Sequence, residues 1–210
     1  MLLRSGQRFL LIGDSITDAG RFEDPEKVGF GYVRMFRDLC WSTYPDRKFE
    51  IVNRGVGGDT IRHLEMRWRR DVIAEKPDVL SVSIGVNDVW RQLQEPPNPE
   101  QVFLDEFEDA YRRLLMQTRN DVSCKLVLCE ATVIGESRED AHNPIIDGYN
   151  ACIARLAREF DALLVPMNRA FWRVIDADPE RRWTTDGVHP MSNGHMLMAL
   201  TLFQTLGGKV

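Results

Sequence analysis

Short apolar runs alternate along the chain with longer segments in which apolar residues recur at helical spacing. The runs end near polar residues, glycine or proline, which is typical of buried strands. The predicted strands cover residues 8–12, 49–53, 79–84, 125–130 and 163–166. The predicted helices bury three apolar stripes: Ile61, Leu64, Trp68 and Val72; Phe103, Phe107, Ala110, Tyr111 and Leu114; Ile146, Tyr149, Ile153, Leu156 and Phe160. A last helix is expected over residues 192–206 and ends before two glycines.

This alternation predicts an α/β protein of flavodoxin-like type, a three-layer α/β/α sandwich with a central parallel five-stranded sheet. No internal repeat, low-complexity tract or linker divides the sequence, so residues 1–210 are interpreted as a single domain. The proline-rich stretch 95–99 is interpreted as a rigid loop. Ligands of such folds bind beyond the carboxyl ends of the strands, so functional residues should directly follow strands.

Composition and charge exclude several classes of protein. With 43% hydrophobic and 28% charged residues, the chain is neither disordered, collagen-like nor membrane-spanning in type. Its 27 basic and 32 acidic residues give a net charge of −5, which argues against a nucleic-acid partner. The densest basic stretch, residues 62–70, is interrupted by Glu65 and is interpreted as a solvated face with ion pairs.

The cysteines bear on the compartment. Cys40, Cys124, Cys129 and Cys152 form no C-x-x-C pair and no dense disulfide framework, as expected in a reducing environment. The chain is therefore predicted to be cytoplasmic, unless a leader has been removed.

The first candidate for chemistry is Ser15, which follows the first predicted strand within Gly13-Asp14-Ser15-Ile16-Thr17. A serine at this turn presents its hydroxyl and its own N–H at the same place, beside a helix N-terminus that favours negative charge. A serine is also a good N-cap, and capping alone would explain it. The motif is not the G-x-S-x-G nucleophile elbow, because Thr17 stands where that elbow requires glycine.

The second candidate is Asp186-Gly187-Val188-His189-Pro190, near the end of the chain. A serine hydroxyl is a weak nucleophile until a base takes its proton, and an imidazole oriented by a carboxylate is the usual base. Asp186 can orient His189 if Gly187 and Pro190 form a tight loop between them. Taken alone, the same residues would also fit a turn with a surface ion pair.

Two further loops after predicted strands offer donors for an oxyanion. One is the glycine-rich turn of residues 53–60, in which backbone N–H groups can point outward at Gly57 and Gly58. The other is Gly85-Val86-Asn87-Asp88, where the Asn87 amide can donate to the same point. Backbone geometry and a local turn are the simpler explanations of each loop taken separately. Their joint position beyond the same sheet edge as the serine favours an acyl-transfer site.

These blocks resemble those of the GDSL, or SGNH, hydrolase family. The four blocks, in family order, are Gly13-Asp14-Ser15-Ile16-Thr17-Asp18, Gly57-Gly58-Asp59-Thr60, Gly85-Val86-Asn87-Asp88 and Asp186-Gly187-Val188-His189-Pro190. The resemblance implies an SGNH hydrolase fold with Ser15 as nucleophile, His189 as base and Asp186 as its orienting carboxylate. It also implies three oxyanion donors, which are the Ser15 N–H, the Gly58 N–H and the Asn87 side chain. Gly57 remains the alternative to Gly58.

The sequence is most similar to bacterial GDSL-type acetylxylan esterases, in stretches close to residues 10–21, 31–33, 67–68, 71–78 and 85–92. That resemblance implies a serine esterase that removes O-acetyl groups from xylan or xylooligosaccharides through an acetyl-serine intermediate. Residues 95–99 and 131–143 match poorly and are expected to border the substrate. Two alternatives remain, a lysophospholipase or thioesterase acting on longer acyl chains, and a non-catalytic binding module.

Accessory residues complete the predictions. Asp14, Trp90 and Trp183 lie close in sequence to the motifs and are predicted to contact substrate, although ordinary packing would equally explain the tryptophans. The remaining histidines, His63, His142 and His195, have no ligand spacing, so neither a metal nor a cofactor is expected. The expected partner is a small-molecule or oligosaccharide ester, without nucleic acid or membrane. A homo-oligomer is expected from the resemblance alone.

Overall fold

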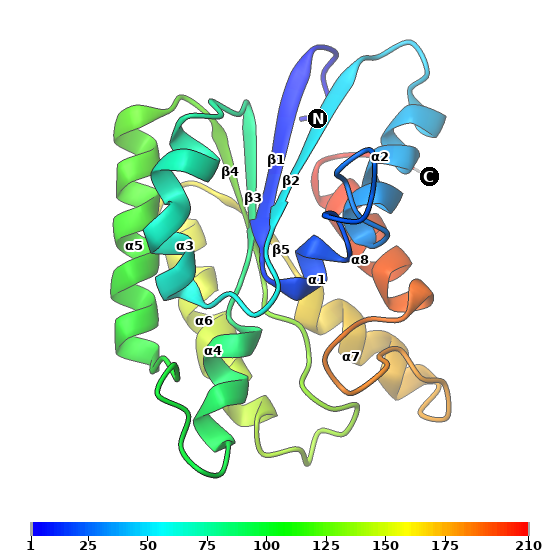
Figure 1. The fold of residues 1–210 in the computed structure, drawn as a ribbon. Coiled ribbons are helices and arrows are strands. Elements are labelled where there is room, and N and C mark those ends of the chain that lie inside the picture. The colour runs from blue at the N-terminus through cyan, green and yellow to red at the C-terminus, as the bar shows by residue number, and fades with distance from the viewer. Residues whose placement is uncertain (1, 210) are drawn as a thin grey trace.

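The computed structural model describes residues 2–209 and contains a parallel sheet of five strands in the order β2-β1-β3-β4-β5 (Figure 1). The strands are β1 (Gln7–Gly13), β2 (Phe49–Gly55), β3 (Val79–Ser83), β4 (Lys125–Cys129) and β5 (Leu163–Val165). Each overlaps a predicted run, with ends that differ by at most two residues. Strand β2 continues through Gly55, so residues 53–55 belong to the strand and not to the predicted glycine-rich turn. The prediction of a three-layer sandwich around a five-stranded parallel sheet is confirmed.

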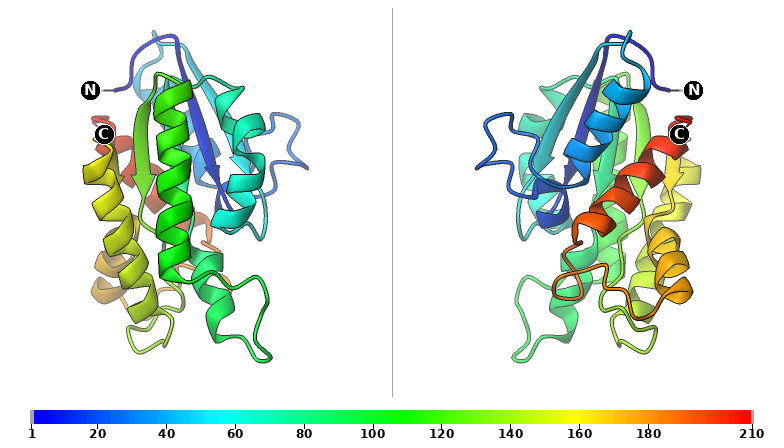
Figure 2. Two further views of the ribbon diagram at one scale, coloured as in Figure 1. Left: turned by 90° about the vertical axis from the view of Figure 1, so that its left-hand side faces the viewer. Right: turned by 90° about the vertical axis from the view of Figure 1, so that its right-hand side faces the viewer.

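Helices cover both faces of the sheet, as the two side views in Figure 2 show. One layer contains α3 (Ile61–Trp68), α5 (Leu104–Asp121) and α6 (Asn143–Glu159). The other contains α2 (Tyr32–Thr43), α7 (Met167–Ala177) and α8 (Ser192–Thr205). Two short helices, α1 (Ser15–Asp18) and α4 (Val86–Trp90), lie beyond the sheet edge where the strands end. Helices α2 and α7 were not among the predicted elements.

The apolar stripes predicted from the sequence lie in the core, except that Phe160 is only partly buried at the end of α6 and Phe103 is exposed. All five residues of β3 are buried, because helices pack on both faces of a parallel sheet and leave no polar face. On α3, Leu64 and Trp68 are at most 1% exposed. Phe103 is wrongly assigned to the core: it precedes the first turn of α5, where its side chain is 56% exposed. No helix within the described range is long and apolar enough to cross a bilayer.

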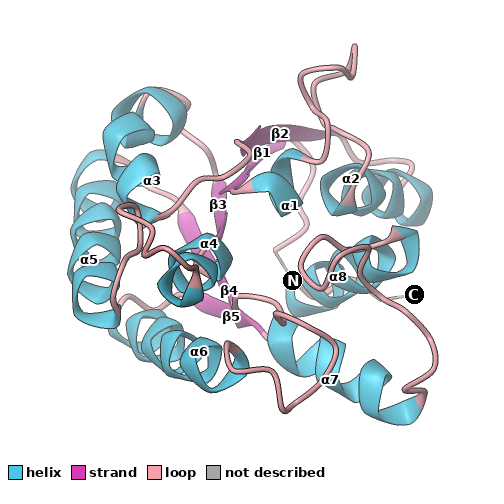
Figure 3. Ribbon diagram, turned by 60° about the horizontal axis from the view of Figure 1, so that its bottom comes forward, coloured by secondary structure: helices cyan, strands magenta, loops and turns pink. Residues whose placement is uncertain are grey.

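The strand order determines where a site can form. Strand β1 lies between β2 and β3, so the loops that follow these three strands leave the sheet side by side. Figure 3, which looks toward this edge, shows α1, α4 and the segment before α8 grouped around it. Residues from both ends of the chain meet there, because α8 packs against α2.

Candidate active site

Ser15 stands at the junction between β1 and α1. The N-cap of α1 is Asp14, whose carboxylate accepts a hydrogen bond of 3.0 Å from the Ile16 N–H. The alternative that Ser15 itself caps the helix is therefore wrong, and its hydroxyl is free for another partner. The turn is tight, because a Cβ on Gly13 would lie 2.2 Å from the carbonyl oxygen of Ser83.

Ser15 and His189 meet although 174 positions separate them in the sequence. Ser15 Oγ lies 2.9 Å from His189 Nε2, and His189 Nδ1 lies 2.7 Å from Asp186 Oδ2. The other carboxylate oxygen accepts hydrogen bonds from the backbone N–H groups of Val188 and His189, at 3.0 and 2.9 Å. Partial burial raises the pKa of Asp186, but these hydrogen bonds outweigh it and lower the pKa to about 2. The carboxylate is therefore ionised and orients the imidazole.

A short antiparallel hairpin carries both residues of this pair. Its arms are joined by a bridge between Thr184 and Pro190, and Gly187 turns between them with φ at +91°. That backbone conformation is strained for residues with a side chain, which explains the glycine. The side chains of Asp186 and His189 are about half exposed, at 50% and 49%, so the imidazole is accessible to a substrate from solvent.

Potential hydrogen-bond donors lie on the segments that follow β1, β2 and β3. Among the described residues, no acceptor takes a hydrogen bond from the N–H groups of Ser15, Gly57 or Gly58. Asn87 Nδ2 donates one bond of 3.0 Å to the carbonyl oxygen of Asp59 and keeps its second hydrogen for another acceptor. Gly58 has φ at +81°, whereas a Cβ on Gly57 would lie 4.0 Å from Ser15 Cβ. Gly57 therefore lies close to the serine, whereas Gly58 remains a candidate through its unpaired N–H group.

A buried arginine on α3 holds the loops that carry these donors. Arg67 Nε donates to Asp59 Oδ2 at 2.7 Å, and its Nη1 donates to Asp71 Oδ2 at 2.8 Å. The same guanidinium also donates to the carbonyl oxygens of Arg54 and Gly13, at 2.8 and 3.1 Å. The prediction of a solvated face is wrong for Arg67, which is 8% exposed. Helical spacing could have revealed this, since it lies beside the buried residues of its helix.

Two residues that follow Asn87 hold the same glycine-rich loop. Asp88 Oδ1 accepts the Ile61 N–H at 3.0 Å, and Arg91 donates to the carbonyl oxygen of Gly58 at 2.7 Å. The second oxygen of Asp88 is buried and has no partner among the described residues. Burial raises the pKa of Asp88 to about 7, and it does the same for Asp14. Both carboxyls therefore take up protons at a pH where exposed carboxyls are fully ionised.

The accessory residues lie in different surroundings. Asp14 is only 2% exposed and its carboxylate caps α1, so its contact with substrate stays a prediction. Trp90 is half-buried, and its ring stacks on that of His142 with 6.1 Å between centroids. Trp183 lines a shallow apolar depression of about 270 Å³ together with residues of α8. The structure gives no contact between either tryptophan and the serine.

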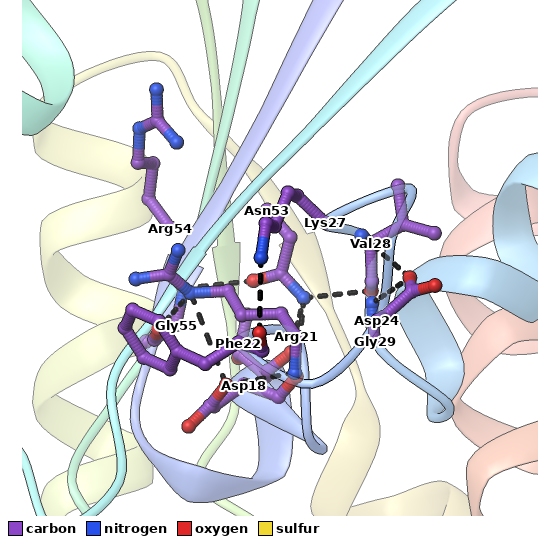
Figure 4. A network of polar contacts seen from close by, with 12 residues as sticks. Asp18, Arg21, Phe22, Asp24, Lys27, Val28, Gly29, Asn53, Arg54 and Gly55 are labelled. Carbon is purple, nitrogen blue, oxygen red and sulfur yellow. Dashed lines mark hydrogen bonds and ion pairs between the residues drawn. The ribbon is translucent and has the colours of Figure 1, made fainter.

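The loop that follows α1 is held by a polar network, shown in Figure 4. The buried amide of Asn53, on β2, donates to the carbonyl oxygens of Thr17 and Val28 at 2.7 and 2.9 Å. Its oxygen accepts the Gly55 N–H at 2.8 Å. Asp24 accepts the Val28 N–H at 3.0 Å from within the same loop. The segment after the serine is thereby joined to the end of β2, a role that sequence analysis did not assign to Asn53.

The remaining histidines have local partners. His195 Nδ1 accepts the Tyr32 N–H at 3.1 Å and so caps α2, while burial and the nearby His189 lower the pKa of His195 to about 4. His63 forms a capping box with Thr60 at the start of α3. Within residues 2–209, no three histidine, cysteine or acidic side chains are grouped as a metal ion would require.

Comparisons with known proteins agree with this arrangement. The family model described as GDSL-like Lipase/Acylhydrolase matches residues 11–197. An acetylxylan esterase of Geobacillus stearothermophilus is 37% identical over 214 residues, covering 99% of this chain and 97% of that protein. The crystal structure of that organism's acetylxylan esterase Axe2 has a TM-score of 0.91 at 35% identity and covers 100% of this chain and 98% of its own. Catalytic mutants of Axe2 replace a serine, an aspartate or a histidine by alanine.

A further solved structure, an alpha/beta hydrolase from the metagenome of Lake Arreo, Spain, has a TM-score of 0.92 at 32% identity. It covers 99% of this chain and 98% of its own. The resemblance read from the four sequence blocks is confirmed by the family match over most of the chain. The protein belongs to the GDSL-like lipase/acylhydrolase family.

Proposed function

We propose that this protein is a serine esterase that removes O-acetyl groups from carbohydrates, with acetylated xylan or xylooligosaccharides as the substrate class. The single observation that carries the proposal is the continuous contact Ser15–His189–Asp186, with atom separations of 2.9 and 2.7 Å. A hydroxyl, an imidazole and an ionised carboxylate in this order form a complete proton-transfer unit. Family membership and the acetylxylan esterase at 37% identity support the choice of ester and sugar.

In the proposed mechanism, His189 removes the proton of Ser15 as its oxygen forms a bond to the acetyl carbonyl carbon. The carbonyl oxygen becomes an oxyanion, which accepts hydrogen bonds from the N–H groups of Ser15 and Gly58 and from the Asn87 amide. Protonated His189 then gives its proton to the sugar oxygen as the ester C–O bond breaks. Asp186 stabilises the imidazolium throughout.

The second half of the reaction returns the enzyme to its starting state. Water attacks the acetyl-serine carbonyl carbon while His189 takes a proton from it. The second tetrahedral intermediate is stabilised by the same donors, and collapse of this intermediate breaks the bond to Ser15. His189 returns its proton to the serine oxygen, and acetate leaves.

The decisive experiment compares acetate release from acetylated xylooligosaccharides with release from other acetyl esters. The same preparation is assayed with acetyl and octanoyl nitrophenyl esters. We expect the acetylated sugar to be preferred and acetyl to exceed octanoyl. A preference for octanoyl would instead support a lysophospholipase or thioesterase. The absence of all ester hydrolysis would support a binding module.

Three further predictions accompany this proposal. A single domain over residues 1–210 is supported by the shared sheet, and limited proteolysis should yield no stable fragment. A cytoplasmic location is supported by four free thiols, three of them buried, and cell fractionation tests it. A homo-oligomer is expected from resemblance, and light scattering measures its mass.

A further inference from the structure

The loop between β4 and α6 (residues 130–142, the β4–α6 loop) lies beside the hairpin that carries the catalytic pair (Figure 1). None of the four family blocks falls within it. The loop has internal support from Asn143, which is 4% exposed. Its Nδ2 donates to the carbonyl oxygens of Ile134 and Ser137, at 2.9 and 2.8 Å, on the two sides of Glu136. The backbone around this glutamate is thereby held in one conformation.

The carboxylate of Glu136 receives its hydrogen bonds from one arm of the hairpin. Glu136 Oε1 accepts the backbone N–H groups of Trp183 and Thr184, at 3.0 and 2.7 Å. It also accepts the Thr184 hydroxyl at 2.5 Å, and its Oε2 lies 3.2 Å from the Trp183 nitrogen. Two successive backbone N–H groups and one hydroxyl thus converge on a single side chain. One side chain therefore anchors the start of the hairpin.

The anchoring continues to the turn of the hairpin. The Thr184 hydroxyl donates to Glu136 and accepts the Gly187 N–H at 3.1 Å, so the carboxylate is connected to the turn through one hydroxyl. A backbone contact reinforces the connection, since the Gly135 N–H donates to the Gly187 carbonyl oxygen at 2.8 Å. Gly187 lies between Asp186 and His189 in the chain. Motion of the turn would therefore displace the imidazole relative to Ser15.

We infer that Glu136 is a positioning residue for the proposed esterase reaction, holding the Asp186–His189 hairpin at the distance from Ser15 that proton transfer requires. This inference rests on the proposed function. Among the described residues, the hydrogen bonds of the Glu136 side chain go to Trp183 and Thr184 and not to the serine or the imidazole, so its effect passes through the hairpin. A base displaced by about 1 Å from productive geometry can cost about 100-fold in rate.

The first test is the variant Glu136→Ala, assayed with acetyl nitrophenyl ester. We expect kcat to fall about 10- to 100-fold while KM changes less than about twofold, because the side chain of Glu136 is bonded to the hairpin and its loss displaces the base. Glu136→Gln keeps an oxygen acceptor for the hairpin N–H groups and should restore most of kcat. The matched control is Glu180→Ala, an exposed carboxylate between α7 and the hairpin, which should leave kcat unchanged.

A second test separates positioning from a general structural role. In a His189→Ala background the residual rate does not use the imidazole, so adding Glu136→Ala should cause no further loss. If Glu136 only stabilised the fold, Glu136→Ala would lower the rate by the same factor with His189 present and with His189→Ala. That result would overturn the inference. Thr184→Val, which removes the hydroxyl connection but keeps the backbone N–H, provides a milder variant should Glu136→Ala fold poorly. It should lower kcat in the same direction.

Hydrogen exchange of the hairpin peptides gives a readout that does not depend on activity. In Glu136→Ala, exchange over residues 183–190 should be faster than in the unsubstituted protein, with exchange in β1 and β3 unchanged. Equal exchange in the hairpin would overturn the anchoring role. If the unsubstituted protein hydrolysed no ester, the proposed function would fail, whereas the exchange comparison would still decide whether Glu136 holds the hairpin.

Discussion

The two halves of the candidate site are supported in different ways. The half with Ser15 and the glycine-rich loop is fixed from inside by Arg67, whose side chain is 9% exposed and pairs with two buried carboxylates. The half with Asp186 and His189 lies on a hairpin whose catalytic side chains are half exposed. In the proposed mechanism, this difference means that the predicted oxyanion donors are oriented by buried charge, whereas the predicted base is held by a few hydrogen bonds at the surface.

Physical chemistry accounts for this division. Donors to an oxyanion act best when they are oriented before the reaction and shielded from water, which requires a rigid loop. A general base must instead reach the substrate and then the attacking water, so it lies where both can enter. We therefore expect that substitutions of residues that support the glycine-rich loop from inside, such as Arg67, lower stability and activity together. Substitutions at the hairpin should affect activity with little change in stability.

The largest effect is expected where the two halves meet. Ser15→Ala removes the atom that attacks the carbonyl and should lower kcat/KM by about 10⁴-fold or more. Steady-state hydrolysis of acetyl nitrophenyl ester measures the loss. Ser42→Ala, on the exposed face of α2, is the matched control and should retain full activity. Equal activity of the two variants would remove Ser15 from the mechanism.

The buried support is tested by Arg67→Met. This change leaves Asp59 and Asp71 buried without their shared cation and should lower the free energy of unfolding by about 3–5 kcal/mol. Urea unfolding measures it. Arg62→Met, on the same helix, breaks a half-exposed pair with Glu106 and should cost at most about 1 kcal/mol. Similar losses in both variants would contradict the proposed contrast between buried and exposed support.

The oxyanion donors are tested by Asn87→Ala. Loss of one donor should lower kcat about 10²- to 10³-fold, or about 2.7–4 kcal/mol of transition-state stabilisation, with a small change in KM. Initial rates of acetyl nitrophenyl ester hydrolysis at increasing ester concentration separate kcat from KM. Asn120→Ala, an exposed asparagine on α5, should leave both constants unchanged. A rise in KM at constant kcat would assign Asn87 to substrate binding instead.

The smallest effect is expected for the buried carboxyl of Asp88, which accepts the Ile61 N–H next to the glycine-rich loop. Burial raises the pKa of Asp88 from 3.8 in the unfolded chain to about 7 in the native state. The native state therefore holds a proton that the unfolded state has lost, and this contribution to stability is present below about pH 4 and disappears as the pH rises through 7.

Asp88→Asn removes this titration. We expect the fall in unfolding free energy between pH 5 and pH 8 to be smaller in the variant than in the unsubstituted protein. Urea unfolding at both values measures the difference. Asp109→Asn changes a carboxyl whose side chain is 72% exposed and should behave as the unsubstituted protein does. If the unfolding free energy of Asp88→Asn fell with pH as much as that of the unsubstituted protein, Asp88 would not titrate between pH 5 and pH 8, contrary to its raised pKa.

Much of the fold was predictable from the sequence because buried parallel strands produce continuous apolar runs. The residues of β3 are all buried, and their run was recognised without ambiguity. Helix α2 was missed, although Tyr32, Val33, Phe36 and Cys40 form its buried side. A glycine, not a capping side chain, precedes its first turn, and the cap comes instead from His195, far along the chain. A helix start that is capped by a distant residue cannot be recognised from the pattern of neighbouring residues.

By itself, the sequence determined the strand–helix alternation and the four short blocks in which Ser15, Asn87, Asp186 and His189 occur, because these are properties of neighbouring residues. Only the tertiary structure decided which distant acceptors Arg67 would meet and that Glu136 would hold the hairpin. Those contacts join segments far apart in the chain. Their partners are chosen by the packing of loops beyond the sheet, and no local spacing encodes that packing.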